Sequence, residues 1–414
     1  MRAVGLIVEY NPFHNGHLYH LRQSVKITDA EAVVAVMSGN FLQRGEPAMW
    51  DKWTRTRMAL AGGCDLVIEL PCAYATQAAE WFAYGAVSLL EATGVVDAFC
   101  FGTESGQLAP LLRAADIAAE EPPRFRELLM GGLGSGASYP VAYSRAVQAY
   151  LGEQGAEDMS RFPFDQPNHT LGLHYLIALK RLKGTMTPYT IAREKAQYHQ
   201  SDVTDSSIAS ATAIRKLLLE SRSLQGISRY VPSSTSSILS ERLDAGVPAM
   251  GWEQYEKPLF RMLLTQDRHR LAEFHEITEG LEHRILNALP ELESWSFESL
   301  LGALKTRRYT RTKLQRALLS ILLGHAKEDF TRDKLAGGVR YIRVLGFTDK
   351  GRELLKDMRR QASLPVLMSA ARPPGSYRYL ELDVRASNAY MLGVPGASLQ
   401  RDLYRDYRDA PIML

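Results

Sequence analysis

The stretch from Gly5 to Leu21, GLIVEYNPFHNGHLYHL, constrains the fold of this chain more than any other. Its apolar start predicts a buried strand, Asn11 and Pro12 break that strand, and the segment from His14 to His17 opens a helix. A strand that leads directly into a helix presents unpaired backbone N–H groups and a partial positive charge, which together suit a phosphate. Gly16 permits a close approach of the backbone, and the two histidines can stabilise charge on a leaving pyrophosphate.

Two alternatives remain open for these histidines. His14, His17 and His20 recur at helical spacing, which also suits a metal site or one partly buried helix face. No cysteine or carboxylate adjoins the three histidines, and the Asn-Pro turn suits a phosphate better, so we predict no metal bound by protein ligands here. The strand, turn and HxGH sequence resemble the signature of the nucleotidyltransferase and class I aminoacyl-tRNA synthetase superfamily.

Length and composition indicate a globular protein with more than one domain. The chain has 414 residues, 46% hydrophobic and 23% charged, and one compact core rarely serves so long a chain. The sequence contains no long apolar run, and its first strand carries Glu9 where a signal peptide would be apolar, so we expect a cytoplasmic protein without a membrane partner. Cys64, Cys72 and Cys100 fit neither a disulfide framework nor a zinc ribbon, and we expect reduced core residues.

Charge is divided unevenly along the chain. Residues 1–220 hold 19 Lys and Arg against 23 Asp and Glu, whereas residues 221–414 hold 30 against 23. A basic excess in the second half suggests contact with a polyanion, although a solvated helical surface could also produce it.

Alternating strand and helix patterns over residues 1–220 predict an α/β domain with a doubly wound parallel sheet. The expected strands after the first lie at 31–38, 64–70, 96–101 and 189–193, with helices at 50–61 and 77–90. From residue 221 onward the pattern predicts mainly helices, near 252–264, 268–287, 297–305, 310–324 and 350–361. Residues 346–356 and 380–392 suggest a small mixed subdomain that closes the chain.

Three residues beyond the first turn are expected to complete a site at the edge of the sheet where open α/β sheets bind ligands. Gly102 follows the fourth strand and would let an adenine or ribose lie against the backbone, although a plain turn glycine is nearly as good an explanation. Asn168 begins a helix near its N-cap, and Arg193 ends the fifth strand.

A second motif, IASATAIR, places Ser210 and Thr212 near a helix start with Arg215 in its first turn. Ordinary helix capping would account for the hydroxyl groups. The segment also resembles the mobile phosphate-contacting motif of the HxGH superfamily, ISSTxIR in the nucleotidyltransferases.

The densest basic run is KTRRYTRTKLQR, from Lys305 to Arg316, which includes Tyr309. Cations beside an aromatic ring suit RNA phosphates and base stacking. The apolar residues that follow indicate a core-facing helix, so the basic residues could instead be its solvated side.

With these pieces placed, the sequence resembles the bacterial tRNA(Met) cytidine acetate ligase family over almost its whole length. The resemblance is carried by VEYNPFHNGHLYHL, MSGNFLQRGEPA, DLVIELP, FGTES, PNHTLG, IAREKAQYH, IASATAIR, RYTRTKLQRALLSILL and RVLGF. It implies a HUP/Rossmann-like nucleotidyltransferase domain over residues 1–220 and a mainly helical, basic, tRNA-binding domain over residues 221–414. The family usually has a second asparagine where His169 stands, and often a glycine near Lys195.

The resemblance also implies the chemistry. ATP and acetate would give acetyl-adenylate and pyrophosphate, and the acetyl group would pass to the wobble cytidine in the anticodon loop of elongator tRNA(Met), forming N4-acetylcytidine. Mg²⁺ is expected with ATP, and no particular oligomeric state is predicted. The implied ATP site comprises Ile7, Val8, Glu9, Tyr10, Asn11, Pro12, Phe13, His14, Asn15, Gly16, His17, Leu18, Tyr19, His20, Gly102, Asn168 and Arg193.

Formation of an acyl-adenylate needs alignment and charge stabilisation more than a nucleophilic side chain. We expect His14 and His17, at a solvent-facing helix start, to contact the leaving phosphates, and Arg215 to contact the β- and γ-phosphates. Ser210 and Thr212 would lie beside them. In the loop GNFLQRGEP, Arg44 or Asn40 is expected to contact acetate or the α-phosphate, and a loop-anchoring role for Arg44 is the alternative.

Two other functions fit parts of the sequence. The N-terminal half alone would permit a nucleotidyltransferase that adenylylates a small phosphate-bearing metabolite, but such an enzyme needs no basic helical half. A non-catalytic RNA-binding protein with a relic nucleotide fold is disfavoured because His14, His17 and Arg215 are all present.

Overall fold

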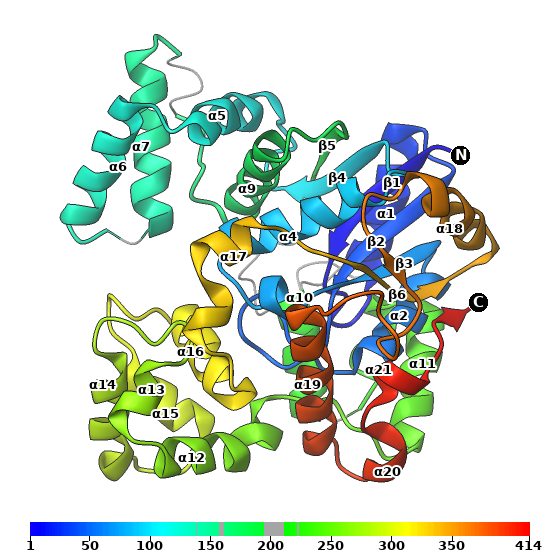
Figure 1. Ribbon diagram of the computed structural model, residues 1–414, viewed down its shortest axis with the longest axis vertical. Coiled ribbons are helices and arrows are strands. Elements are labelled where there is room, and N and C mark those ends of the chain that lie inside the picture. Colours follow the sequence, from blue (N-terminus) through cyan, green and yellow to red (C-terminus); the bar gives the residue numbers. More distant parts are fainter. Residues whose placement is uncertain (138, 157–160, 194–210, 222) are drawn as a thin grey trace.

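The computed structural model describes residues 1–137, 139–156, 161–193, 211–221 and 223–414. Its centre is a sheet whose first five strands are parallel, in the order β5-β4-β1-β2-β3 (Figure 1). The strand patterns of the first half are therefore confirmed. These strands are β1 (Ala3–Val8), β2 (Ala32–Ser38), β3 (Leu66–Leu70), β4 (Ala98–Thr103) and β5 (Thr187–Ala192).

Helices cover both faces of this sheet because its strands are apolar on both faces. In β2, Val34 and Val36 pack into one buried cluster, whereas Val33 and Ala35 pack into another. The first cluster includes residues of α4 (Ala79–Ala92), α5 (Ala109–Glu120), α7 (Tyr139–Glu153) and α9 (Pro167–Arg181), and the second includes residues of α1 (Asn15–Thr28), α2 (Lys52–Ala61), α10 (Ala211–Ser221) and α11 (Ser233–Asp244).

The sheet also receives strands from the end of the chain. β6 (Ile342–Phe347) pairs antiparallel with β3, and β7 (Val366–Leu367) and β8 (Ile412–Met413) pair with β6. The expectation of a separate mixed subdomain in this region was wrong: residues 342–347 extend the main sheet, α18 (Asp349–Gln361) follows, and residues 378–393 form one helix, α19 (Arg378–Gly393). A strand pattern in the sequence indicates no pairing partner, which explains the error.

The helical region of the second half has its own buried core. Leu259, Leu281, Leu300 and Leu318 belong to a third cluster, built by α12 (Glu256–Thr265), α14 (Leu281–Ala288), α15 (Phe297–Leu304) and α16 (Arg311–Leu323). The single helix expected at 268–287 is instead α13 (Arg268–Ala272) and α14, because Glu276, Glu279 and Gly280 adopt left-handed backbone angles between them. The division of domains at residue 220 remains a prediction.

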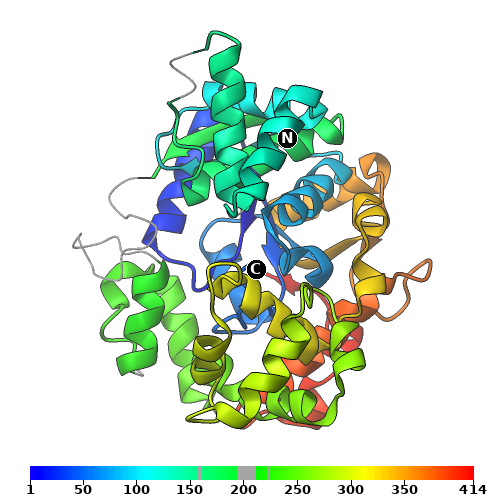
Figure 2. The ribbon, with the colours of Figure 1, turned by 90° about the vertical axis from the view of Figure 1, so that its left-hand side faces the viewer.

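Figures 1 and 2 place this helical region at one end of the molecule and α6 (Pro123–Gly134) with α7 at the other.

All three cysteines are buried free thiols, as expected. Within the described ranges, no helix is long and apolar enough to cross a membrane. The remaining elements are α3 (Cys72–Ala75), α17 (Arg332–Ala336), α20 (Leu399–Asp402), α21 (Arg405–Arg408) and short 3-10 turns at Ser228–Tyr230, Trp252–Tyr255, Leu289–Glu291 and Lys327–Phe330.

Candidate nucleotide site

The turn between β1 and α1 is fixed by aromatic packing and by a hydrogen bond to the loop after β2. Tyr10 and Phe13 are buried with their rings in edge contact, 4.7 Å between centroids. The side-chain oxygen of Asn11 accepts a hydrogen bond of 2.8 Å from the backbone N–H of Met49. The turn is therefore fixed to the core and to the loop after β2, and the first turn of α1 has a defined position at the end of β1.

His14 and His17 form a reciprocal cap at the start of α1. The backbone N–H of His17 donates to Nδ1 of His14, and the backbone N–H of His14 donates to Nδ1 of His17, each over 3.3 Å. The rings stack with centroids 3.6 Å apart. Because Nδ1 is the acceptor in both neutral rings, each imidazole carries its proton on Nε2 and keeps one N–H to donate.

The histidines of this helix are neutral. Burial, with the cations of Arg193 and Arg215, lowers the pKa of His14 to about 3. Burial, with His14 and then Arg193, lowers the pKa of His17 well below its usual value, and burial with Arg193 lowers that of His20 to about 4. The expectation of a solvent-facing helix start was wrong for His14, which is 4% exposed because the turn folds it into the cap.

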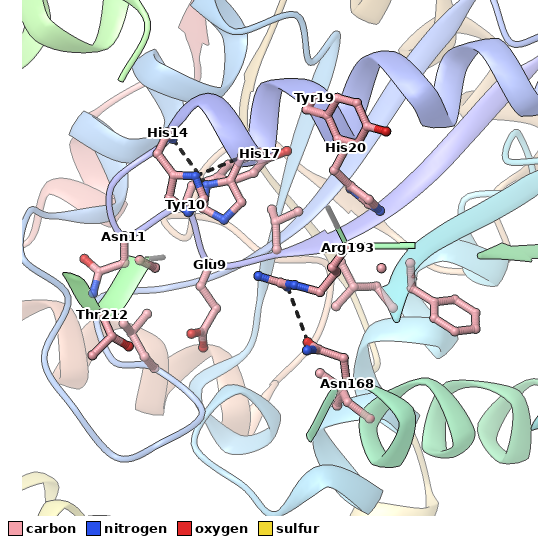
Figure 3. A pocket seen from close by; sticks show the side chains of 18 of the residues that line it. Glu9, Tyr10, Asn11, His14, His17, Tyr19, His20, Asn168, Arg193 and Thr212 are labelled. Atoms are coloured by element: carbon pink, nitrogen blue, oxygen red, sulfur yellow. Dashed lines mark hydrogen bonds between the residues drawn. The ribbon is translucent and has the colours of Figure 1, made fainter. Parts of the chain in front are cut away.

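A cavity of about 270 Å³ opens beside this helix start (Figure 3). Asn11 Nδ2 and His20 Nε2, on two of its lining residues, are buried and have no hydrogen-bond partner among the described residues. Such atoms are costly unless a ligand or water pairs with them. The predicted residues that line the cavity are Ile7, Val8, Glu9, Tyr10, Asn11, His14, Gly16, His17, Tyr19, His20, Gly102, Asn168, Arg193, Thr212 and Arg215.

Four residues of the predicted run do not line the cavity. Phe13 is fully buried in the core, and Leu18 packs against the same core cluster. Asn15 donates its amide to the carbonyl oxygen of Arg229, and Pro12 stands within the turn. A helix turns only one face toward a cavity, and contact of the whole run with ATP stays a prediction. Ser210 lies outside the described residues.

The opposite wall comes from the ends of β4 and β5 and from α9. Arg193 Nη1 donates to Asn168 Oδ1 over 3.4 Å (Figure 3). Gly102 lies beneath the Arg193 side chain: a Cβ there would stand 3.3 Å from Arg193 Cγ and 3.8 Å from His20 Cδ2. The missing side chain therefore lets the arginine lie across the strand end.

Sequence reasoning missed the group that fixes Asn168. Glu104 Oε1 accepts from both the backbone N–H (2.9 Å) and the side-chain amide (2.8 Å) of Asn168, and Glu104 Oε2 accepts from the backbone N–H of His169 (2.9 Å). A carboxylate at a helix N-terminus is favourable, and here it caps α9. The motif FGTES contained this residue, but only the fold brings it to the helix.

Arg55 is a second residue that the sequence did not single out. Its guanidinium is fully buried and donates to the carbonyl oxygens of Glu9 (2.6 Å), Ser38 (3.0 Å) and Gly39. It therefore ties together the ends of β1 and β2. Glu9 in turn accepts 2.8 Å from the backbone N–H of Gln43, and burial raises its pKa although Gln43, Arg215 and Arg55 oppose that rise.

Known proteins resemble this chain over its whole length. Residues 1–405 match the HIGH Nucleotidyl Transferase family. The tRNA(Met) cytidine acetate ligase of Lysinibacillus sphaericus (strain C3-41) is 39% identical over 416 residues, with 100% of each chain covered. The enzyme of the same name from Halalkalibacterium halodurans is 40% identical over 418 residues, covering 100% of this chain and 98% of that one. This chain belongs to the tRNA(Met) cytidine acetate ligase family.

Solved structures of the family have the same fold. TmcAL of Thermotoga maritima without ligand matches with a TM-score of 0.92 at 33% identity, and TmcAL bound with alpha-thio ATP matches with a TM-score of 0.90 at 34% identity. Both alignments cover 100% of each chain. The α/β nucleotidyltransferase fold expected from the first turn is thereby confirmed.

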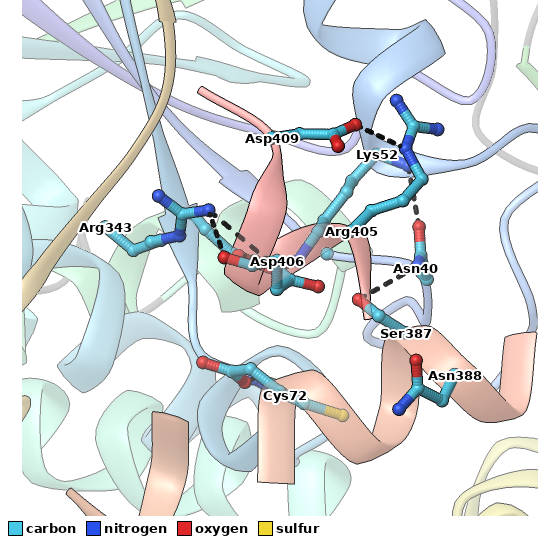
Figure 4. Close-up of polar contacts among 12 residues, drawn as sticks. Asn40, Lys52, Cys72, Arg343, Ser387, Asn388, Arg405, Asp406 and Asp409 are labelled. Atoms are coloured by element: carbon cyan, nitrogen blue, oxygen red, sulfur yellow. Dashed lines mark hydrogen bonds and ion pairs between the residues drawn. The ribbon is translucent and has the colours of Figure 1, made fainter. Parts of the chain in front are cut away.

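The loop 39–47 is held by the C-terminal part of the chain (Figure 4). Asn40 Oδ1 accepts 2.6 Å from the backbone N–H of Lys52, and Asn40 Nδ2 donates 3.3 Å to Ser387 Oγ. Asn40 is buried and does not line the nucleotide cavity, whereas Arg44 lines it. In this family member Asn40 fixes the loop, and of the two residues expected at acetate only Arg44 reaches the cavity.

The basic run near α16 also differs from expectation. Tyr309 is buried, its hydroxyl donates 2.7 Å to the carbonyl oxygen of Glu279, and Lys313 Nζ lies over its ring, 5.4 Å from the centroid, so the ring does not serve as a stacking platform. Arg308 pairs with Glu279 over 2.8 Å and Arg311 with Glu298 over 2.5 Å, in largely exposed positions. Exposed pairs are weak, so these cations remain able to meet phosphates.

Proposed function

We propose that this chain activates acetate with ATP and transfers the acetyl group to the wobble cytidine of elongator tRNA(Met), forming N4-acetylcytidine. One observation carries the proposal: the complete HxGH turn borders a cavity in a chain that matches tRNA(Met) cytidine acetate ligases from end to end. A relative solved with alpha-thio ATP supports ATP as the nucleotide.

In the first step, an oxygen of acetate attacks the α-phosphorus of ATP, and the bond to the pyrophosphate oxygen breaks. The pyrophosphate leaves with the bonding electrons, so negative charge grows on its bridging oxygen. The Nε2–H groups of His14 and His17, with the first backbone N–H groups of α1, are donors suited to that charge. Burial lowers the pKa of both imidazoles, so both are neutral donors at neutral pH.

Two arginines supply the positive charge on the other side of the cavity. Arg193 is positioned by Asn168, and Arg215 Nη2 donates 3.3 Å to Thr212 Oγ1 in the first turn of α10. We assign Arg215 to the β- and γ-phosphates, and Gly102, Asn168 and Arg193 to the nucleoside and its adjoining phosphate. Arg44 also lines the cavity, and its charge matches the carboxylate of acetate.

Mg²⁺ is expected to arrive with ATP. The described residues contain no group of three or more His, Cys, Asp or Glu side chains that could hold a metal ion. Mg²⁺ on a nucleotide needs only one or two carboxylates besides the phosphates and water. Glu9 and Glu46 both line the cavity and fit that requirement. When bound, the ion would neutralise phosphate charge.

In the second step, the exocyclic amine of cytidine attacks the acetyl carbon, AMP leaves with the bonding electrons, and the amine loses one proton. A wobble base is single-stranded and can enter a pocket without opening a duplex. Adenylylation of a small metabolite fits the cavity equally well, but it leaves the whole-length match to tRNA-acetylating ligases unexplained.

The test is an incubation with ATP and labelled acetate, with and without elongator tRNA(Met). We expect acetyl-adenylate and pyrophosphate in both reactions, and AMP with label on RNA only with tRNA. Transfer of AMP to a metabolite without acetate consumption would favour the nucleotidyltransferase alternative, and absence of both AMP and label would favour a binding protein.

A further inference from the structure

A second cavity, of about 830 Å³, adjoins the nucleotide cavity. It lies between the sheet and the helical region, with walls from the loop before α2, from α10, from the segment around Trp252, and from α15 and α16. Its volume is within the range of small-ligand sites. The two cavities share the lining residues Asn11, Arg44, Glu46, Thr212 and Arg215.

Three aromatic side chains, Trp50, Trp252 and Phe297, line this second cavity. Trp252 stacks flat on Phe297, with centroids 4.0 Å apart and an interplanar angle of 8°. Trp50 lines the same cavity and is 1% exposed. Phe297 is 1% exposed, so Trp252, at 9%, is the ring of these three that a base can reach from the cavity, and such rings commonly hold unstacked bases.

The same lining residues carry buried donors without partners. The indole N–H groups of Trp50 and Trp252 and the side-chain amide of Asn11 have no hydrogen-bond partner among the described residues. All three side chains are at least nine-tenths buried. Buried donors are nearly always paired in a working protein. A cytosine ring offers acceptors at O2 and N3, which complement donors of this kind.

Two cationic side chains with exposed surface also line the cavity. Lys216 is exposed on α10, and Arg311 lines the cavity from α16. The Arg311 pair with Glu298 is largely exposed on both side chains, 51% and 67%. An exposed pair contributes little, so a phosphate can replace Glu298 as the partner of Arg311 without great cost.

We propose that this second cavity is the acceptor site: it takes one unstacked pyrimidine nucleotide of the tRNA, with its base against Trp252 and its phosphates at Lys216 and Arg311. The inference rests on the proposed function. The acyl group is bonded to the α-phosphate during the reaction, so the cytidine amine must approach it at the border between the two cavities. The five residues that line both cavities lie at this border.

The test compares two steps in the full-length protein. Adenylate formation without tRNA is followed by acetate-dependent exchange of pyrophosphate into ATP, and acetyl transfer is followed in single turnovers with elongator tRNA(Met). Trp252→Ala should lower transfer about tenfold or more, the scale of one lost base-stacking side chain, while exchange stays within about twofold. Arg311→Ala should raise the KM for tRNA severalfold without changing the KM for ATP or acetate.

Matched controls come from the same region. Trp295 is 53% exposed and contacts Phe260, and Arg270 is an exposed partner of Glu273; neither residue lines either of the two cavities. Trp295→Ala and Arg270→Ala should leave both steps unchanged. Trp252→Phe keeps a flat ring and should retain more than half of the transfer rate, which separates lost stacking from lost folding.

Several outcomes overturn the inference. If Trp252→Ala and Arg311→Ala transfer acetate as well as their controls do, the acceptor binds elsewhere. If either variant raises the KM for ATP or acetate, the cavity belongs to the first step. If Trp252→Ala does not fold, Trp252→Phe and Arg311→Ala decide by the same criteria. Failure of the unmutated protein to acetylate tRNA would instead contradict the proposed function itself.

Discussion

The ammonium group of Lys52 lies 2.7 Å from a carboxylate oxygen of Asp406, 354 positions further along the chain (Figure 4). Lys52 also pairs with Glu69 on β3, and all three side chains are nearly inaccessible to solvent. Burial opposes the charge of Lys52, but Asp406 and Glu69 together raise its pKa. The C-terminal segment around Asp406 is thereby bound to Lys52, whose backbone N–H also bonds to Asn40 in the loop 39–47.

Asp406→Ala should therefore destabilise the protein by about 3–5 kcal/mol, because it leaves a buried ammonium with one partner. The matched control is Asp409→Ala in the same tail, whose pair with Arg405 is partly exposed and should contribute less than about 1 kcal/mol. Urea unfolding of both variants measures the difference. Equal losses would mean that the buried cluster is not what holds the tail.

Replacement of His14 should separate catalysis from folding. His14→Asn keeps a side chain that caps helices well, whereas His14→Ala loses both the cap and the imidazole. Both should lower adenylate formation by at least about a hundredfold, the scale of one lost transition-state donor. Only His14→Ala should also be less stable, with a free energy of unfolding about 1 kcal/mol lower because the helix cap is lost. Near-normal pyrophosphate exchange by His14→Asn would remove the histidine from the mechanism.

Acid should destabilise the protein through its buried histidines. Burial lowers the pKa of His325 to about 3, whereas the unfolded chain binds a proton near pH 6.5. The contribution of His325 is thus complete above pH 6.5 and is lost as the pH falls toward 3, at about 1.4 kcal/mol per pH unit. Between pH 6 and 4, His325→Gln should reduce the slope of the unfolding free energy against pH by the contribution of one proton, about 1.4 kcal/mol per pH unit. An unchanged slope would show that His325 is protonated in the folded protein.

The basic run should serve tRNA and not ATP. Neutralising Arg307, Arg308 and Arg311 together should weaken tRNA binding and reduce its salt dependence, because fewer counterions are released. Pyrophosphate exchange without tRNA should continue. A control triple variant of Lys356, Arg359 and Arg360 on α18, which Figure 1 places beside the sheet and away from α16, should bind tRNA normally. Equal loss of exchange and transfer in the first variant would make this helix structural.

The sequence predicted residues that line the cavity where the geometry is local, and it missed contacts between residues far apart in the chain. His14, His17 and Gly16 follow from one strand, one turn and one helix start, and they line the cavity. Glu104 and Asp406 act through residues 64 and 354 positions away, and no local pattern reveals such pairings. Asn40 and Tyr309 were placed at ligands because their side chains suit that role, but the fold buries both.

The fold shows the same division. Strand periodicity located β2, β3 and β4 within a few residues, since alternation and apolar runs are local signals. The pairing of β6 with β3 joins segments nearly three hundred positions apart and gave no such signal.

The central claim is acetylation of one cytidine, and nucleoside mass spectrometry tests it most directly. Elongator tRNA(Met) incubated with this protein, ATP and isotopically labelled acetate is digested and analysed, beside a transcript whose wobble cytidine is replaced by uridine. We predict N4-acetylcytidine with the acetate label in the first tRNA, and none in the second. Absence of labelled N4-acetylcytidine from the first tRNA, under conditions in which the protein forms AMP, would contradict the account.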